Sequence, residues 1–93
     1  MNKCPLVDIV ICSYRNREAT SQCIDSLLAL FYPNYNIILI DDYSNDDTVE
    51  YLRKKYPKIN LIENSNNLGP AEARNFGIKM AKGEYIVAMD NDA

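Results

Sequence analysis

Two apolar runs of the chain each end in acidic residues, and this repetition is the strongest pattern in the sequence. Residues 37–40 are followed by Asp41 and Asp42, and residues 85–89 lead into Asp90-Asn91-Asp92. Four consecutive apolar residues, most of them β-branched, are typical of a strand buried on both faces, as in a parallel sheet. Open α/β sheets bind ligands in the crevice outside the carboxyl ends of their strands. Two acidic strand ends therefore predict one acidic site.

The rest of the chain alternates between predicted strands and helices. Apolar residues recur at helical spacing from about Glu18 to Phe31, and Pro33 would stop that helix. Ser44 and Asp47 resemble a capping box. The predicted strands are 7–12, 37–40, 60–63 and 84–89; the predicted helices are 18–31, a second one from the capping box to about 56, and 70–82 with Gly83 as its C-terminal cap.

This order of elements predicts an α/β fold with a Rossmann-like, mostly parallel sheet. Right-handed crossovers would place helices on both faces of the sheet. The 93 residues are 47% hydrophobic and 25% charged, which suits one small globular domain over residues 1–93.

The charge of the chain speaks against a nucleic-acid partner. The formal net charge is −3, and the densest basic group is 53–55 with Lys58 beyond it. These residues fall late in a predicted helix, where they would complement its dipole and face solvent. Nucleic-acid backbones are bound by clustered Lys and Arg, so no nucleic acid is expected.

The cysteines and the N-terminus predict a cytoplasmic location. Cys4, Cys12 and Cys23 are too widely spaced for a CxxC motif, and no His completes a metal site. We expect them to be reduced and mostly buried. The apolar run 7–12 is interrupted by Asp8, so the chain shows neither a signal peptide nor a membrane span at its start.

Each candidate site residue has two interpretations when taken alone. Asp90-Asn91-Asp92 suits a hard divalent cation, but an isolated DxD matches often by chance. For Asp41 and Asp42, the sequence supports a binding site and the start of a turn about equally. Arg74 reaches a phosphate or is solvated.

The loop after the first strand is also ambiguous. Ser13 and Tyr14 line the crevice or belong to a polar loop. The loop has no glycine, which disfavours a Rossmann fingerprint or a phosphate-cradling loop.

Several motifs in one order resolve these ambiguities. They are Cys12-Ser13-Tyr14-Arg15, Asp41-Asp42-Tyr43-Ser44-Asn45-Asp46, Asn67-Leu68-Gly69, Ala73-Arg74-Asn75-Phe76-Gly77, Ala81-Lys82-Gly83-Glu84-Tyr85-Ile86 and Asp90-Asn91-Asp92. With them the chain closely resembles the N-terminal, nucleotide-binding half of the family-two glycosyltransferases. These are inverting enzymes of the GT-A fold that transfer a sugar from a nucleoside diphosphate donor to an acceptor hydroxyl.

The resemblance implies a role for each nucleotide-site residue. Asp42 would accept a hydrogen bond from the base, most often uracil, and Asp41 would support the turn. Ser13 and Tyr14 would line the base and ribose pocket. Arg74 would reach the pyrophosphate or the loop carboxylates.

The resemblance also implies a metal cofactor, Mg²⁺ or Mn²⁺. Asp90 would lie near the ribose and the metal, and Asp92 would bind the cation that bridges the diphosphate. That cation would act as a Lewis acid on the departing nucleoside diphosphate.

Three residues depart from the family pattern. Cys12 replaces the usual Pro, Arg15 the usual Asn, and Tyr43 the usual Gly. If the turn after the second strand requires a positive φ, Tyr43 is strained.

The resemblance further implies that the 93 residues lack the acceptor-binding half. The general base would lie beyond Ala93, so no catalytic residue is expected in this chain, and it should not transfer sugar by itself. The acceptor (glycan, lipid or protein) is left open, and the full-length protein could act at the inner face of a membrane. Uncovered apolar surface and a free strand edge predict self-association.

Two other functions compete with this hypothesis. Phosphatase-like or receiver-like domains also use strand-end aspartates with Mg²⁺, but they place acidic residues after the first strand, where this chain has Ser13-Tyr14-Arg15. A non-catalytic α/β interaction module with a vestigial acidic crevice is the main alternative, and nucleotide binding would discriminate it.

Overall fold

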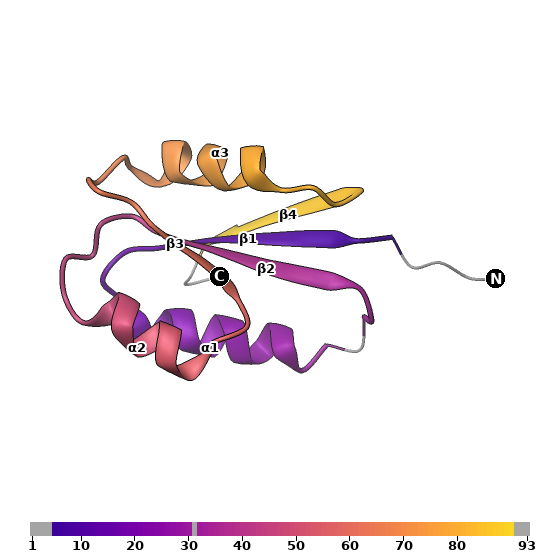
Figure 1. The fold of residues 1–93 in the computed structure, drawn as a ribbon, viewed down its shortest axis with the longest axis horizontal. Helices are drawn as coiled ribbons and strands as arrows, with labels where there is room; N and C mark the ends of the chain where they lie inside the picture. Colours follow the sequence, from indigo (N-terminus) through magenta and orange to yellow (C-terminus); the bar gives the residue numbers. More distant parts are fainter. Residues whose placement is uncertain (1–4, 31, 91–93) are drawn as a thin grey trace.

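The computed structural model describes residues 5–30 and 32–90 (Figure 1). Their elements are β1 (Val7–Ser13), α1 (Arg17–Leu28), β2 (Tyr35–Asp41), α2 (Thr48–Lys55), β3 (Asn60–Glu63), α3 (Pro70–Met80) and β4 (Tyr85–Asp90). The predicted alternation of strands and helices is confirmed.

The strands form one parallel sheet in the order β3-β2-β1-β4. Helix α3 lies on one face, and α1 with α2 lies on the other (Figure 1). The predicted fold class is therefore confirmed. Because β1 and β2 occupy the centre, the carboxyl end of β1 lies between those of β2 and β4.

Alternating residues of the two central strands divide the core into two layers. Ile9 and Ile11 of β1 pack with the α1–α2 layer, whereas Val10 and Cys12 pack on the α3 side. Gly77 brings α3 close to the sheet, because a Cβ at this position would overlap Val10 and lie 3.2 Å from Ile40 Cγ1. The pattern of apolar residues in β1 thus serves both faces of the sheet.

The first two helices differ from the prediction at their ends. Helix α1 ends at Leu28, three residues earlier than expected. It begins at Arg17, and its N-cap is Asn16, whose side chain accepts a hydrogen bond from the Ala19 N–H at 3.2 Å. The predicted capping box is wrong. Asp47 is the N-cap of α2 and makes no side-chain capping bond, while Ser44 lies before it in the preceding turn. The Ser44 hydroxyl instead bonds the carboxylate of Asp41.

The prediction that Gly83 caps α3 is also wrong. The helix ends at Met80, and its cap, Ala81, is extended. Gly83 lies two residues further, where a Cβ would meet Leu6 O at 2.6 Å. The buried carboxylate of Asp8 accepts hydrogen bonds from the backbone N–H groups of Lys82 (2.7 Å) and Gly83 (2.6 Å). Asp8 therefore fixes the turn between α3 and β4.

Two cysteines follow the prediction, since the thiols of Cys12 and Cys23 are reduced and buried. Burial raises the pKa of the Cys23 thiol. Cys4 lies outside the described residues. No helix within 5–30 and 32–90 combines the length and apolar character needed to cross a membrane.

Candidate functional site

The carboxyl edge of the sheet gathers the ends of β2, β1 and β4. In the strand register Ser13 is the partner of Asp41, and Cys12 is the partner of Asp90. The acidic ends of β2 and β4 therefore flank the end of β1, as parallel pairing requires. Asp92, the second predicted metal ligand, lies outside the described residues.

Asp41 holds the turn that follows β2. Its carboxylate is fully buried and accepts hydrogen bonds from the backbone N–H of Ser44 (2.9 Å) and from the Ser44 hydroxyl (2.5 Å). Tyr43 and Asn45, on either side of Ser44, have φ values of 64° and 56°. A tyrosine in this left-handed region is strained, as expected where Tyr43 replaces a glycine.

Asp42 joins the end of β2 to the loop that precedes α3. Its carboxylate accepts hydrogen bonds from Asn64 Nδ2 (3.1 Å), from the Leu68 N–H (2.8 Å) and from the Gly69 N–H (2.9 Å). An ionised carboxylate offers about four acceptor positions. Among residues 5–30 and 32–90, three donors contact this carboxylate, so one position, on Oδ2, has no donor there.

The loop after β1 carries an exposed aromatic side chain. The Ser13 hydroxyl is buried in a 2.8 Å hydrogen bond with Thr20 of α1, so this side chain is turned away from solvent. Tyr14 is 45% exposed, and the guanidinium of Arg15 lies over its ring, 5.3 Å from the centroid. An exposed ring and a cation at a strand end can bind a planar, anionic ligand.

Cations and carboxylates alternate around the start of α2. Arg17 pairs with Asp47 at 2.6 Å, on the exposed side of the loop. Hydrogen bonds from the side chain and backbone of Thr48 hold the pKa of the Asp46 carboxyl below its usual value, and the nearby Arg15 and Arg17 act in the same direction.

Arg74, another predicted site residue, lies half-buried in α3.

The described residues alone do not complete a metal centre. Within 5–30 and 32–90, no three His, Cys, Asp or Glu side chains are grouped so that they could hold an ion. The predicted ligand pair includes Asp92, which this range leaves out.

The sequence did not reveal the residues that connect these loops. Ser44 matched a capping box by its spacing, although it bonds Asp41 and Arg15. Asn67 stood out only as part of the motif Asn67-Leu68-Gly69, and Asn64 carried no such signal. Asn67 donates to the backbone oxygen of Asp42 at 3.3 Å and accepts from the Gly69 N–H at 3.1 Å.

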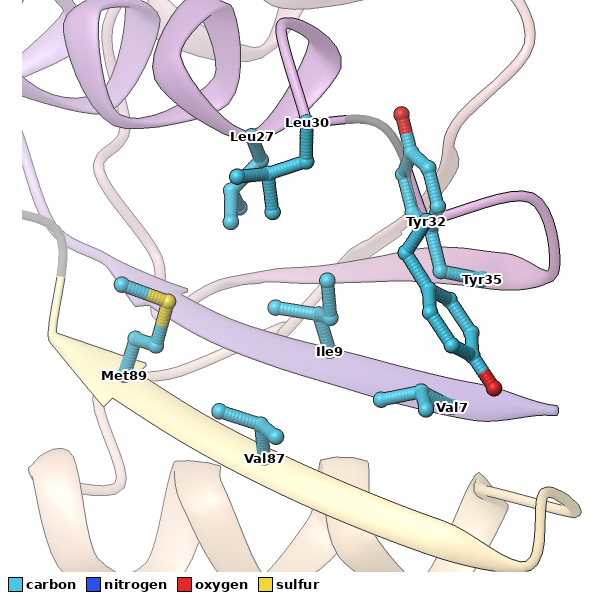
Figure 2. A pocket seen from close by; sticks show the side chains of 8 residues that line it. All are labelled: Val7, Ile9, Leu27, Leu30, Tyr32, Tyr35, Val87 and Met89. Atoms are coloured by element: carbon cyan, nitrogen blue, oxygen red, sulfur yellow. The ribbon is translucent and has the colours of Figure 1, made fainter. Parts of the chain in front are cut away.

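An apolar cavity lies away from the carboxyl edge. Figure 2 shows it between α1 and the sheet. Its volume is about 240 Å³. Its lining is aliphatic, thioether or tyrosine throughout: Val7, Ile9, Leu27, Leu30, Tyr32, Tyr35, Val87 and Met89. It offers no carboxylate or cation, so the candidate chemistry stays at the carboxyl edge.

The arrangement defines a class of protein, since parallel α/β sheets with polar loops at the carboxyl edge are typical of nucleotide-binding domains. The family model described as Glycosyl transferase family 2 matches residues 8–93. The chain therefore belongs to glycosyl transferase family 2, and the predicted family is confirmed.

Curated relatives share this segment of sequence. The poly(ribitol-phosphate) beta-glucosyltransferase of Bacillus spizizenii is 41% identical over 92 residues, which cover 92% of this chain and 14% of that protein. The Escherichia coli enzyme WfaP, a UDP-Glc:alpha-D-GlcNAc-diphosphoundecaprenol beta-1,3-glucosyltransferase, is 40% identical over 88 residues, or 94% of this chain and 35% of that protein. The chain thus spans at most about a third of the length of either relative.

Solved structures share the fold. The mannosyltransferase PcManGT from Pyrobaculum calidifontis, in complex with GDP-Man and Mn²⁺, matches with a TM-score of 0.82 at 25% identity. The matched region covers 96% of this chain and 28% of the PcManGT chain. S. aureus TarS in complex with UDP-GlcNAc matches with a TM-score of 0.81 at 26% identity, and the matched region covers 92% of this chain and 26% of the TarS chain. The predicted GT-A type of fold is confirmed.

Proposed function

We propose that this chain is the donor-binding part of a glycosyltransferase, and that its ligand is a nucleoside diphosphate sugar, with UDP the expected nucleotide. The observation that carries the proposal is the family match over residues 8–93. Likeness to PcManGT and TarS, which were solved with GDP-Man and UDP-GlcNAc, supports a nucleotide-sugar ligand.

The contacts at the carboxyl edge suggest how the nucleotide would be bound. Tyr14 offers its exposed ring for stacking on the base or ribose. Asp42 offers its last acceptor position to an N–H of the base, while its other positions fix the loop before α3. Ser13 contributes through its backbone oxygen, which accepts the Asp42 N–H at 2.9 Å. Arg74 would pair with the pyrophosphate or a loop carboxylate.

The metal part of the proposal rests on Asp90 and Asp92. Carboxylate oxygens are the donors that Mg²⁺ and Mn²⁺ prefer, and the PcManGT complex contains Mn²⁺. When bound, the cation would supply Lewis-acid stabilisation to the leaving nucleoside diphosphate. Asp90 ends β4 beside β1, so the protein part of such a site would belong to the same edge as Asp42.

The complete reaction needs groups outside these 93 residues. An inverting transfer requires a general base at the acceptor hydroxyl, and we place that base in a part of the longer enzyme that would follow Ala93. The acceptor would be a glycan, lipid or protein. WfaP takes a diphosphoundecaprenol-linked sugar by its name, and a similar acceptor would bring the full-length protein to the inner face of a membrane.

Calorimetric titration with UDP tests the proposal. We expect UDP to bind the wild-type chain more tightly with Mn²⁺ than without it, and we expect Asp92→Ala to abolish the metal-dependent gain, because it removes a metal ligand. Glu84→Ala, which removes an exposed carboxylate outside the proposed site, is the matched control and should bind like the wild type.

Failure to bind UDP, in a sample that is folded and monomeric, would contradict the proposal. It would favour the non-catalytic interaction module, in which the acidic edge has no nucleotide ligand.

A further inference from the structure

Ser44 joins the loops that follow β1 and β2. Its side chain is fully buried. Its hydroxyl accepts a hydrogen bond from the backbone N–H of Arg15 at 2.7 Å and donates one to Asp41 at 2.5 Å. Its backbone oxygen accepts a third from Nε of Arg15 at 3.0 Å. Both the backbone and the side chain of Arg15 are thus held by one residue.

The Ser44 contacts hold a backbone conformation that the loop would otherwise avoid. Arg15 has φ 61°, and the neighbours of Ser44, Tyr43 and Asn45, are also left-handed. Non-glycine residues keep this conformation only where surrounding contacts enforce it, and such residues cluster at ligand sites. A buried hydroxyl that bonds both loops is the contact that enforces it here.

The conformation of Arg15 sets the direction of two exposed side chains. With Nε held by Ser44, the guanidinium lies over the ring of Tyr14. Among the hydrogen bonds of residues 5–30 and 32–90, the guanidinium uses only Nε, so its Nη groups are left for a ligand. The stacked pair forms a platform with an aromatic face and a cation.

We infer that Ser44 is a positioning residue of the nucleotide site, because it fixes Arg15 and thereby the Tyr14–Arg15 platform against which the nucleotide binds. Arg15 contributes its Nη groups to an acceptor oxygen of the nucleotide. The inference rests on the proposed function for the identity of the ligand. The fixed position of Arg15 is independent of it.

The test compares two buried serines by UDP titration. Ser44→Ala should weaken UDP binding about tenfold, since the platform is no longer held. Ser21→Ala is the matched control, because Ser21 is also buried but its hydroxyl has no hydrogen-bond partner among the described residues. Its affinity for UDP should be unchanged. Ser44→Thr keeps the hydroxyl and should recover most of the affinity.

A spectroscopic measurement separates positioning from general stability. In the ligand-free protein, the Arg15 Nε–H should exchange slowly with solvent by NMR, and it should exchange much faster in Ser44→Ala but not in Ser21→Ala. Fast exchange in the wild type would overturn the inference even if UDP binds. If the Arg15 Nε–H exchanges slowly but UDP does not bind, Ser44 does fix Arg15, and the proposed function is wrong instead.

A second variant keeps the test decisive if Ser44→Ala does not fold. Arg15→Gln changes an exposed side chain, so the fold should survive. It should weaken UDP binding about tenfold by removing the guanidinium. Unchanged affinity in folded Ser44→Ala or in Arg15→Gln would contradict the inference.

Discussion

Strands β2 and β4 have the same pattern in sequence, an apolar run that ends in a carboxylate, but they differ sharply in the structure. In β2, residues 37–40 are no more than 3% exposed. In β4, Tyr85 is 60% exposed, Ile86 is 42% exposed and Val87 is 45% exposed. The same pattern therefore gives a core strand in one place and an open strand in the other.

The position of each strand in the sheet explains the difference. Strand β2 pairs with β1 and β3, and helices cover both of its faces (Figure 1). In the part of the chain that the structure describes, β4 pairs with β1 alone and lies at one edge of the sheet. Val87 and Met89 of β4 border the open apolar cavity of Figure 2. An apolar run therefore shows that both faces of a strand are suited to burial, but it does not show what covers them.

A matched pair of substitutions measures this difference in stability. Ile38→Ala should lower the free energy of unfolding by about 2–5 kcal/mol, because Ile38 is 2% exposed and its loss leaves a cavity. Ile86→Ala, the same change on β4, should cost less than about 1 kcal/mol. Urea unfolding followed by circular dichroism checks both. Equal losses would show that β4 is covered in solution.

The open edge of β4 leads to a prediction about self-association. Unpaired backbone groups beside exposed apolar side chains favour pairing with another strand. We expect the wild-type chain to associate as its concentration rises, and Val87→Lys to reduce that association several-fold, since a charge now lies on the edge strand. Sedimentation velocity measures the effect.

The control for this prediction is Glu84→Lys, which places the same charge on a residue that is already polar and exposed. Its association should stay closer to that of the wild type. If the wild type remains monomeric at high concentration, the exposed strand is not sufficient for association.

The sequence predicted the elements well because their periods are distinct. Helical spacing before Pro33, the Gly69-Pro70 start of α3 and the buried run in β2 each have a local physical cause. The family followed from motifs that occur in one order along the chain. These inferences need no knowledge of which residues meet in space.

The contacts between loops could not be predicted in the same way. The spacing of Ser44 and Asp47 suits a helix cap, and only the folded turn shows that the Ser44 hydroxyl bonds Asp41 and Arg15 instead. Asp8 interrupts an apolar strand, and its partners at Lys82 and Gly83 lie more than 70 residues away. Such side-chain bonds to distant backbone groups leave no periodic signal in the sequence.

The most direct test of the account is an NMR map of UDP binding on the ¹⁵N-labelled chain in the presence of Mg²⁺. The account predicts the largest shifts in the loops at 13–15, 41–45 and 64–69, because these loops meet at the carboxyl edge. It predicts small shifts at Val7 and Val87, which line the apolar cavity. Shifts centred on the cavity, with the three loops unchanged, would contradict the assignment of the nucleotide site.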